Sequence, residues 1–307
     1  MFFTETPEWS ALGASITSAL VNRHAAQGLD PESFGLVLIT QGAEGPEGFA
    51  HRGDIAVYPC SLVKTFHLIH ALALLEDARI APHGEMDRAL RDMIRWSSNG
   101  ATNYAIDLIT GTTGDTLLHG AEYLDWVNKR ERLNRFFWVL GWEEWQGCSI
   151  AQKLMDDTRY GREAQFAGAD GAHLNRLTPL AAARLLWELF DGTLPVSPPS
   201  KARAQAILQR DKASPDATNL AYQLAEYLGG DLPEQVQIWS KAGHNLWTGD
   251  AKTSWFKHDM IRLQAEGRKP LIIVLTTQGQ GMAQSHPQSF PQIGRLIWEM
   301  TEDIIRL

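Results

Sequence analysis

The chain has 307 residues, of which 44% are hydrophobic and 21% are charged, a composition typical of a globular protein with a sizeable core. Its formal net charge is −8, with acidic and basic residues interspersed, which argues against a nucleic acid or an anionic membrane surface as a partner. No apolar run reaches the roughly 20 residues of a membrane-spanning helix, so we expect no insertion into a membrane.

The N-terminal part predicts a helix followed by a β-hairpin. Apolar residues recur at helical spacing between Glu8 and Gln27, and residues 34–40 form a short apolar run typical of a strand. After the turn-rich segment 41–48, residues 49–57 can return as a second strand.

The next segment, 58–64, carries the first chemical signal. It opens an almost continuously apolar helix, predicted over 62–75, which indicates a buried helix. Ser61 and Lys64 share one face of it, with Ser61 in the first turn, where free N–H groups favour negative charge. A partly buried lysine one turn deeper has a lowered pKa and can act as a base. The pair is typical of an activated nucleophile, although an ordinary solvated helix start can contain the same two residues.

A second polar element interrupts the helices that follow. A helix predicted over 85–96 runs into Ser97, Ser98 and Asn99, and an apolar helix resumes over 104–109. A hydroxyl and a carboxamide at such a break are either site groups or plain helix caps, since serine and asparagine are favoured at N-caps.

Residues 122–147 are rich in tryptophan and arginine. We expect an amphipathic helix that packs on the core; a pocket wall or a subunit contact is the alternative. Stacking on nucleic acid is the least favoured interpretation, given the negative net charge. The tryptophans are Trp126, Trp138, Trp142 and Trp145.

The polar segment 156–177 predicts a long loop, and long loops in compact domains are often functional. Thr178 and Pro179 then form the N-cap and first position of a helix that continues to Phe190. Residues 202–209 and 220–228 also have a helical pattern.

The C-terminal part returns to strands, predicted over 236–240, 255–263 and 271–277, and closes with an amphipathic helix over 290–305. The first of these strands leads directly into Lys241, Ala242, Gly243 and His244. Strands at both ends with helices between them predict an α+β fold with an antiparallel sheet built from both chain ends.

We therefore expect an α/β domain formed by residues 1–60 and 215–307, and an all-helical domain formed by residues 61–214. The site would lie at their interface, where Ser61 and Lys241 both fall. Segment 1–8 has no export-signal pattern, which predicts a cytoplasmic protein if Met1 is the natural start.

The metal-ligating residue types do not form a recognisable site. Cys60 and Cys148 make neither a disulfide framework nor a metal-binding motif. His67 and His70 lie three apart on one helix without carboxylates at ligand spacing, so we assign them to helix packing or to the surface and expect no metal or cofactor.

Taken together, these motifs resemble the superfamily of class A β-lactamases and penicillin-binding proteins, in particular its β-lactamase-related serine hydrolases. Ser61-Leu62-Val63-Lys64 matches the Ser-x-x-Lys motif, 97–99 matches the usual Ser-Asp-Asn, and 241–243 matches the usual Lys-Thr-Gly. Residues 177–179 resemble the helix start after the omega loop. The similarity covers nearly the whole chain, and the motifs come in the right order.

The resemblance implies a role for each matching residue. Ser61 would form an acyl-enzyme, Lys64 would take its proton, and Ser97 would pass a proton to the leaving group. Lys241 would be catalytic too, because it would tune Ser97 electrostatically while it holds a substrate carboxylate. Asn99 would bind the substrate amide, with Ala242 and Gly243 as further substrate-binding positions. The backbone N–H groups of Ser61 and His244 would form the oxyanion hole.

Several positions depart from the family pattern. Ser98 replaces the usual aspartate, Ala242 replaces the threonine, and His244 brings a titratable side chain to the edge of the pocket. Cys60 matches a cysteine that some carbapenem-hydrolysing members join in a disulfide, but the partner position holds Asn245, so we expect a free thiol.

The deacylating glutamate of class A enzymes has no evident counterpart, because no Glu-x-x-Leu-Asn sequence occurs in 156–177. Glu163, Asp156 and Asp157 are candidates by position only.

The leading hypothesis is a serine hydrolase that cleaves an amide, lactam or ester bond through a Ser61 acyl-enzyme. The alternatives are a genuine β-lactamase, a penicillin-binding or sensor protein that acylates slowly, and an acyltransferase. The partner expected is a small molecule with a carboxylate and an apolar part. A homo-oligomer is the protein partnership that the sequence leaves open.

Overall fold

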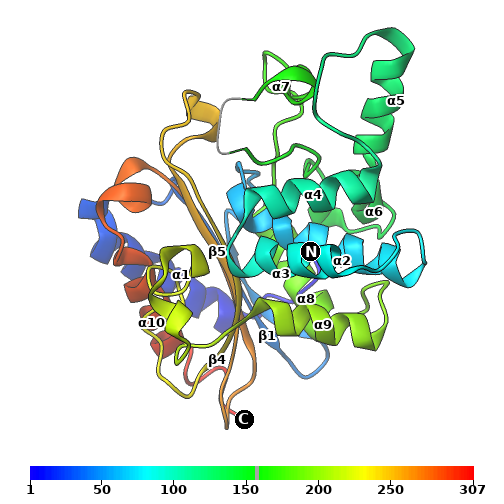
Figure 1. The fold of residues 1–307 in the computed structure, drawn as a ribbon. Coiled ribbons are helices and arrows are strands. Elements are labelled where there is room, and N and C mark those ends of the chain that lie inside the picture. The colour runs from blue at the N-terminus through cyan, green and yellow to red at the C-terminus, as the bar shows by residue number, and fades with distance from the viewer. Residues whose placement is uncertain (156–158) are drawn as a thin grey trace.

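The computed structural model describes residues 1–155 and 159–307. Its centre is one antiparallel six-stranded sheet in the order β2-β1-β6-β5-β4-β3, shown edge-on in Figure 1. The strands are β1 (Phe34–Gln41), β2 (Pro46–His51), β3 (Gln209–Arg210), β4 (Gln237–His244), β5 (Phe256–Gln264) and β6 (Leu271–Gln278). The first two strands and the last two thus meet in the middle of the sheet, as the α+β prediction requires.

Helices cover both faces of this sheet (Figure 1). On one face lie α1 (Pro7–His24) and α10 (Ser289–Met300). On the other lie α2 (Val63–Glu76), α3 (Gly84–Arg95), α4 (Asn99–Thr110), α8 (Pro179–Phe190) and α9 (Pro198–Leu208). Three further helices, α5 (Gly120–Arg130), α6 (Arg132–Trp138) and α7 (Gly161–Ala167), complete the helical side.

Strands β1 and β6, which lie side by side near the middle of the sheet, are largely apolar because both of their faces are covered. Along β1, Leu36 and Leu38 belong to the core beneath α1 and α10, whereas Val37 and Ile39 belong to the core beneath α2 and α8. This alternation is the two-residue period of a strand, and it fixes the register of β1 against β6. The sheet is thereby a rigid support for side chains on its strands, such as Lys241 on β4.

Most predicted elements are confirmed, including the helices at the N-terminus, after Ser61 and after Thr178. Thr178 caps α8 by accepting a hydrogen bond from the Ala181 amide (3.0 Å), with Pro179 at the first helical position. The three C-terminal strands and the closing helix are also present.

Four predictions of local structure need correction. The second strand is Pro46–His51 and ends before Arg52, whose positive φ of 48° turns the chain away from the sheet. Segment 122–147 is divided into α5, α6 and a 3₁₀ turn, and the predicted loop 156–177 contains α7. The helix predicted over 220–228 is a 3₁₀ turn, Leu220–Tyr222, that stops at Gln223 in the left-handed conformation.

The division into domains at residues 60 and 214 stays a prediction. Helix α8, which it assigns to the helical domain, packs against β1 and β6. In the described part of the chain, no helix is both long and apolar enough to cross a membrane.

Candidate active site

Ser61 lies in a strained turn that leads into α2. It is the middle residue of the 3₁₀ turn Cys60–Leu62, and Cys60 before it has a positive φ of 48°. His258 of β5 anchors this turn to the sheet. Its Nε2 donates to the Tyr58 carbonyl (2.9 Å), and its Nδ1 accepts from the Thr277 amide (3.2 Å). These two bonds fix the tautomer of His258 and anchor the segment just before Ser61.

Lys64 is fully buried one turn further along the helix, and it points to the helix break at Ser97. Its Nζ contacts the Ser97 carbonyl, Asn99 Oδ1 (2.8 Å) and Ser97 Oγ (3.2 Å). Ser97 Oγ in turn donates to Ser61 Oγ (2.9 Å). A continuous path of hydrogen bonds therefore joins Ser61 to Lys64 through Ser97.

The residues at the break between α3 and α4 have two different roles, one in helix capping and one in the site. Ser98 is the N-cap of α4, since its Oγ accepts from the Ala101 amide (3.1 Å). Ser97, with a positive φ of 52°, and Asn99 instead face Lys64. The helix-cap interpretation thus applies to Ser98, and the site-group interpretation applies to Ser97 and Asn99.

Lys241 reaches the same serine from β4 and is also fully buried. Its Nζ donates to Ser97 Oγ (3.0 Å), to the Ala242 carbonyl (2.6 Å) and to the side-chain oxygen of Gln223. Burial, followed by the nearby charges of Lys64 and Arg210, holds the pKa of Lys241 well below its usual value. Ser97 Oγ accordingly lies between two lysine side chains.

Gly243 allows β4 to pass directly behind Ser61. A Cβ at this position would lie 2.8 Å from the Pro59 carbonyl oxygen and 2.9 Å from the Ser61 nitrogen. Neither backbone atom can yield, so any side chain here would push β4 away from the nucleophile. Ala242 turns its side chain to the core beneath α1 and α10.

His244 ends β4 at the rim of the site. Its Nε2 donates to the Ala283 carbonyl (2.7 Å), which leaves Nδ1 as the free nitrogen of the neutral ring. Burial lowers the pKa of His244, a shift that the bond to Ala283 partly offsets.

Backbone strain is concentrated around these residues. Among the described non-glycine residues, six have positive φ, and three of the six (Cys60, Ser97 and Gln223) touch Ser61, Lys64 or Lys241 or adjoin them in the chain. Such conformations cost roughly 1–3 kcal/mol each, and they cluster at functional sites. The strained residues therefore lie in the same candidate site as the residues of the three motifs.

Ser61 opens on a hollow of about 700 Å³, large enough for a small-molecule substrate. Residues of its wall include Ser61, Asn99, Gln152, Arg159, His244 and Trp247. A second hollow of about 760 Å³ lies on the other side of Tyr58 and is lined by different residues except for Tyr58 itself. Of the two, only the first contains the nucleophile candidate.

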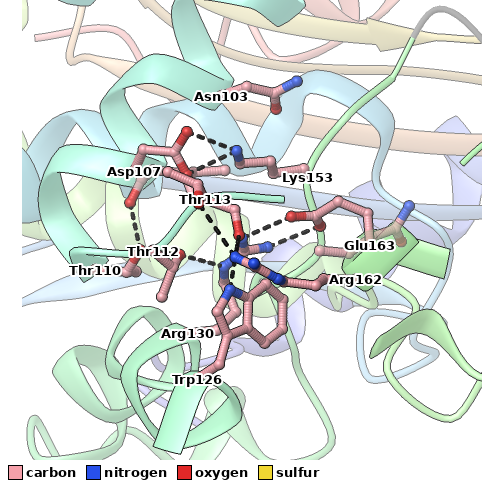
Figure 2. Close-up of polar contacts among 12 residues, drawn as sticks. Asn103, Asp107, Thr110, Thr112, Thr113, Trp126, Arg130, Lys153, Arg162 and Glu163 are labelled. Atoms are coloured by element: carbon pink, nitrogen blue, oxygen red, sulfur yellow. Dashed lines mark hydrogen bonds and ion pairs between the residues drawn. The ribbon is translucent and has the colours of Figure 1, made fainter. Parts of the chain in front are cut away.

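Glu163 is not part of the wall around Ser61. Its carboxylate is 2% exposed and forms a two-pronged ion pair with Arg130, at 2.7 and 2.9 Å (Figure 2). Arg130 also donates to the Ala151 carbonyl and Thr112, and Lys153 pairs with Asp107 at 2.7 Å beside it. The positional match of Glu163 to a deacylating glutamate is therefore wrong, because Arg130 engages both of its carboxylate oxygens. Asp156 and Asp157 lie outside the described residues.

The tryptophan-rich segment packs mainly on the core. Trp126 and Trp145 are 4% and 1% exposed, and Trp142 packs on the edge of the main core, whereas Trp138 is 59% exposed. None of the four lines the hollow at Ser61. Cys60 and Cys148 are free thiols, as predicted for Cys60, and burial raises the pKa of Cys60.

Sequence reasoning missed three residues of the site: Gln223, His258 and Arg159. Gln223 contacts Lys241, His258 holds the Tyr58 carbonyl, and Arg159 lines the hollow. They belong to no motif and stand in segments without distinctive patterns, so no signal in a single sequence could have selected them.

Comparisons with known proteins agree with this geometry. The model of a family described as the beta-lactamase enzyme family matches residues 30–301. Because that match spans most of the sequence, the chain belongs to the β-lactamase enzyme family. None of the curated proteins matches it.

Solved structures that are similar to the chain include class A β-lactamases. That of the last common ancestor of Gram-negative bacteria is 16% identical, with a TM-score of 0.62 over 93% of this chain and 98% of that one. A β-lactamase from Burkholderia vietnamiensis is 15% identical, with a TM-score of 0.63 over 94% and 96%. An ancestral class A β-lactamase is 17% identical, with a TM-score of 0.61 over 92% and 99%. The chain therefore has the class A β-lactamase fold.

Proposed function

We propose that the protein is a serine hydrolase that cleaves an amide, lactam or ester bond through an acyl-enzyme on Ser61. The observation that carries the proposal is the hydrogen-bonded path from Ser61 Oγ to Ser97 Oγ and on to the two buried lysines. Two lysines that converge on hydroxyls supply the base and acid of acyl transfer without a histidine.

In the acylation step, Ser61 Oγ forms a bond to the substrate carbonyl carbon. Its proton moves to Ser97 Oγ, whose own proton moves to Lys64, which acts in its neutral form. The carbonyl oxygen becomes an oxyanion, for which the amides of Ser61 and His244 would be the donors. The bond to the leaving nitrogen or oxygen then breaks, and the leaving group takes a proton back through Ser97.

Deacylation needs a water molecule that attacks the Ser61 ester, gives up a proton and releases the acid. The products are the free serine and a carboxylic acid, so atoms and charge balance. No described carboxylate lines the hollow. We therefore assign no base to this step.

The other groups would bind the substrate. Asn99, whose Oδ1 accepts a hydrogen bond from Lys64, would form a hydrogen bond with the amide of the substrate. His244 on the wall would lie near an acidic group, on which the fully buried Lys241 would act only through its charge, and the exposed Trp247 on the wall would contact an apolar part. A substrate with a carboxylate and an apolar portion fits this wall.

The test is covalent labelling with a fluorophosphonate probe, followed by mass spectrometry of the intact protein. We expect one adduct, on Ser61, which is lost in Ser61→Ala. Ser98→Ala is the matched control, because Ser98 only caps α4, and it should keep the adduct. Adduct formation that persists in Ser61→Ala would overturn the proposal.

The alternative functions differ in the fate of the acyl-enzyme. Steady turnover of nitrocefin or benzylpenicillin would identify a β-lactamase, as the class A fold favours. A burst of product without turnover would identify a penicillin-binding or sensor-type protein. Products that require an added amine would identify an acyltransferase.

A further inference from the structure

Gln223 holds the buried ammonium of Lys241 with an uncharged side chain. It is 7% exposed, and its side-chain oxygen accepts a hydrogen bond from Lys241 Nζ. A lysine ammonium carries donors only, so the amide oxygen of Gln223, rather than its NH2 group, must face Lys241.

The backbone of Gln223 is strained where this contact is made. The residue ends the 3₁₀ turn Leu220–Tyr222 with φ 56° and ψ 48°, a left-handed conformation that favours glycine. Glycine there would relieve the strain but would remove the acceptor for Lys241. A strained conformation that aims a side chain at a reacting group is the pattern expected of a functional position.

Although burial lowers the pKa of Lys241, the three acceptors around its Nζ match an ammonium group, because a neutral amine has only two N–H donors. Its Nζ carries three N–H donors when protonated, and Ser97 Oγ, the Ala242 carbonyl and Gln223 receive one each. All three acceptors are uncharged. A carboxylate at the Gln223 position would satisfy the same donor but would add a negative charge beside both lysines.

The remaining charged groups near Lys241 come from four other elements. Lys64 of α2 and Arg210 of β3 oppose its positive charge, whereas Asp259 of β5 and Cys60 favour it. Burial raises the pKa of Asp259 to about 7 and keeps the Cys60 thiol protonated, so neither supplies a full negative charge near neutral pH.

We propose that Gln223 is a positioning residue for the reaction at Ser61: its amide oxygen holds the Lys241 ammonium on Ser97 Oγ without neutralising it. This role rests on the proposed function. The retained positive charge polarises Ser97 Oγ, and it also repels a proton from Lys64, which must be neutral to act as the base. Lys64 can therefore stay neutral and act as the base only because the partner of Lys241 is uncharged.

Gln223→Glu is the decisive variant, because it keeps size, shape and the acceptor while adding a charge. The carboxylate would stabilise both protonated lysines, Lys241 by direct contact and Lys64 from beyond Ser97, and an opposite charge within about 4–6 Å moves a pKa by about 1–3 units. We expect the acid limb of the pH dependence of acylation, which follows Lys64, to move to higher pH by up to about that amount. At pH 7 the rate of labelling should therefore fall several-fold or more, and it should recover at higher pH.

Gln223→Met is the complementary variant, because it fills the space without an acceptor. One N–H of the buried ammonium then lacks a partner, which favours the neutral amine. The labelling rate should fall through loss of position, and the acid limb should not move to higher pH. Gln237→Glu is the matched control, since it adds the same charge to an exposed position of the strand that carries Lys241, β4.

The experiment measures the rate of fluorophosphonate labelling of Ser61 from pH 5 to 10 in the full chain, with circular dichroism as the check on folding. An alkaline shift in Gln223→Glu alone supports the role. Equal losses at every pH in Gln223→Glu and Gln223→Met indicate a purely structural residue and overturn it. Unchanged profiles in both overturn it as well and leave the proposed function intact, whereas absence of Ser61 labelling in the wild type overturns both.

Discussion

Two largely buried clusters of polar and charged side chains lie on the side of the sheet that faces the α2 helix, and they differ in how their charges are partnered. In the Arg130 cluster (Arg130, Glu163, Lys153 and Asp107; Figure 2), each cation contacts a carboxylate at 2.7 Å. In the Ser97 cluster (Ser61, Lys64, Ser97 and Lys241), the contacts of Lys241 within the described chain are a hydroxyl, an amide and a carbonyl.

The difference separates a structural role from a chemical one. A paired charge has a counterion that cancels its field, so it can hold segments together but has little effect on neighbouring groups. A charge that is partnered only by dipoles keeps its field, which can act on a reacting hydroxyl in a site of low dielectric constant. The Arg130 cluster fastens residues 151–153 and α7 to α4 and α5, whereas the Ser97 cluster converges on one oxygen.

The largest expected difference between the two clusters is in how substitutions change the free energy of unfolding. Glu163→Gln leaves Arg130 buried without its carboxylate, and breaking a buried pair in this way costs about 3–5 kcal/mol. Lys241→Met removes a buried charge that has no carboxylate partner among the described residues, so the free energy of unfolding should stay the same or rise. Urea unfolding of the two variants measures both effects, and equal destabilisation by both would contradict the distinction.

A second test concerns chemistry. Lys64→Ala should lower the rate of Ser61 labelling on the order of 10²-fold or more, the scale expected for the loss of a general base. Lys153→Ala is the matched lysine of the Arg130 cluster, and it should lose stability while its labelling rate changes only a few-fold. A comparable loss of rate in Lys153→Ala would remove the basis for assigning different roles to the clusters.

The third test uses a buried group that has no ionic partner. His67, one turn after Lys64 on α2, is fully buried, and both ring nitrogens lack a hydrogen-bond partner among the described residues. Burial, followed by the charges of His70 and Lys64, lowers the pKa of His67 to about 3 from its usual 6.5.

A histidine with a lowered pKa binds its proton more tightly in the unfolded chain. Stability is therefore complete above pH 6.5 and is lost as the pH falls toward 3, by about 2 kcal/mol at pH 5 for this one group. His67→Leu should reduce that loss in urea unfolding at pH 5 relative to pH 7. The exposed His286→Leu is the control, and an unchanged pH dependence in His67→Leu would count against a neutral, buried His67.

Local patterns in the sequence were sufficient for much of the fold. The runs at 34–40 and 271–277 are apolar because both faces of the central sheet are covered there, and a short unbroken apolar run is the pattern expected of such strands. Thr178 and Pro179 announce the start of α8 through capping chemistry, which depends only on neighbouring residues. Segment 122–147 was harder, because its two helices are divided at Glu131 by packing rather than by a glycine or proline.

The candidate site was predictable where it follows motifs. Ser61, Lys64, Ser97, Asn99 and Lys241 are joined in the structure by the hydrogen bonds that their motifs suggest, while their chemical roles stay proposals. Glu163 shows the limit of reasoning by position, since its partner Arg130 comes from α5, 33 residues earlier in the chain. Pairing at that distance is decided by how helices pack, which no local pattern records.

By itself, the sequence determined the order of the elements and the identities of the groups that converge on Ser97. These depend on side-chain period, capping and residue type, all of which act over a few positions. Only the tertiary structure decided which buried charges acquire a carboxylate and which keep an uncharged partner such as Gln223. That choice depends on burial and on contacts between distant segments, because the cost of burying a charge is set by everything that surrounds it.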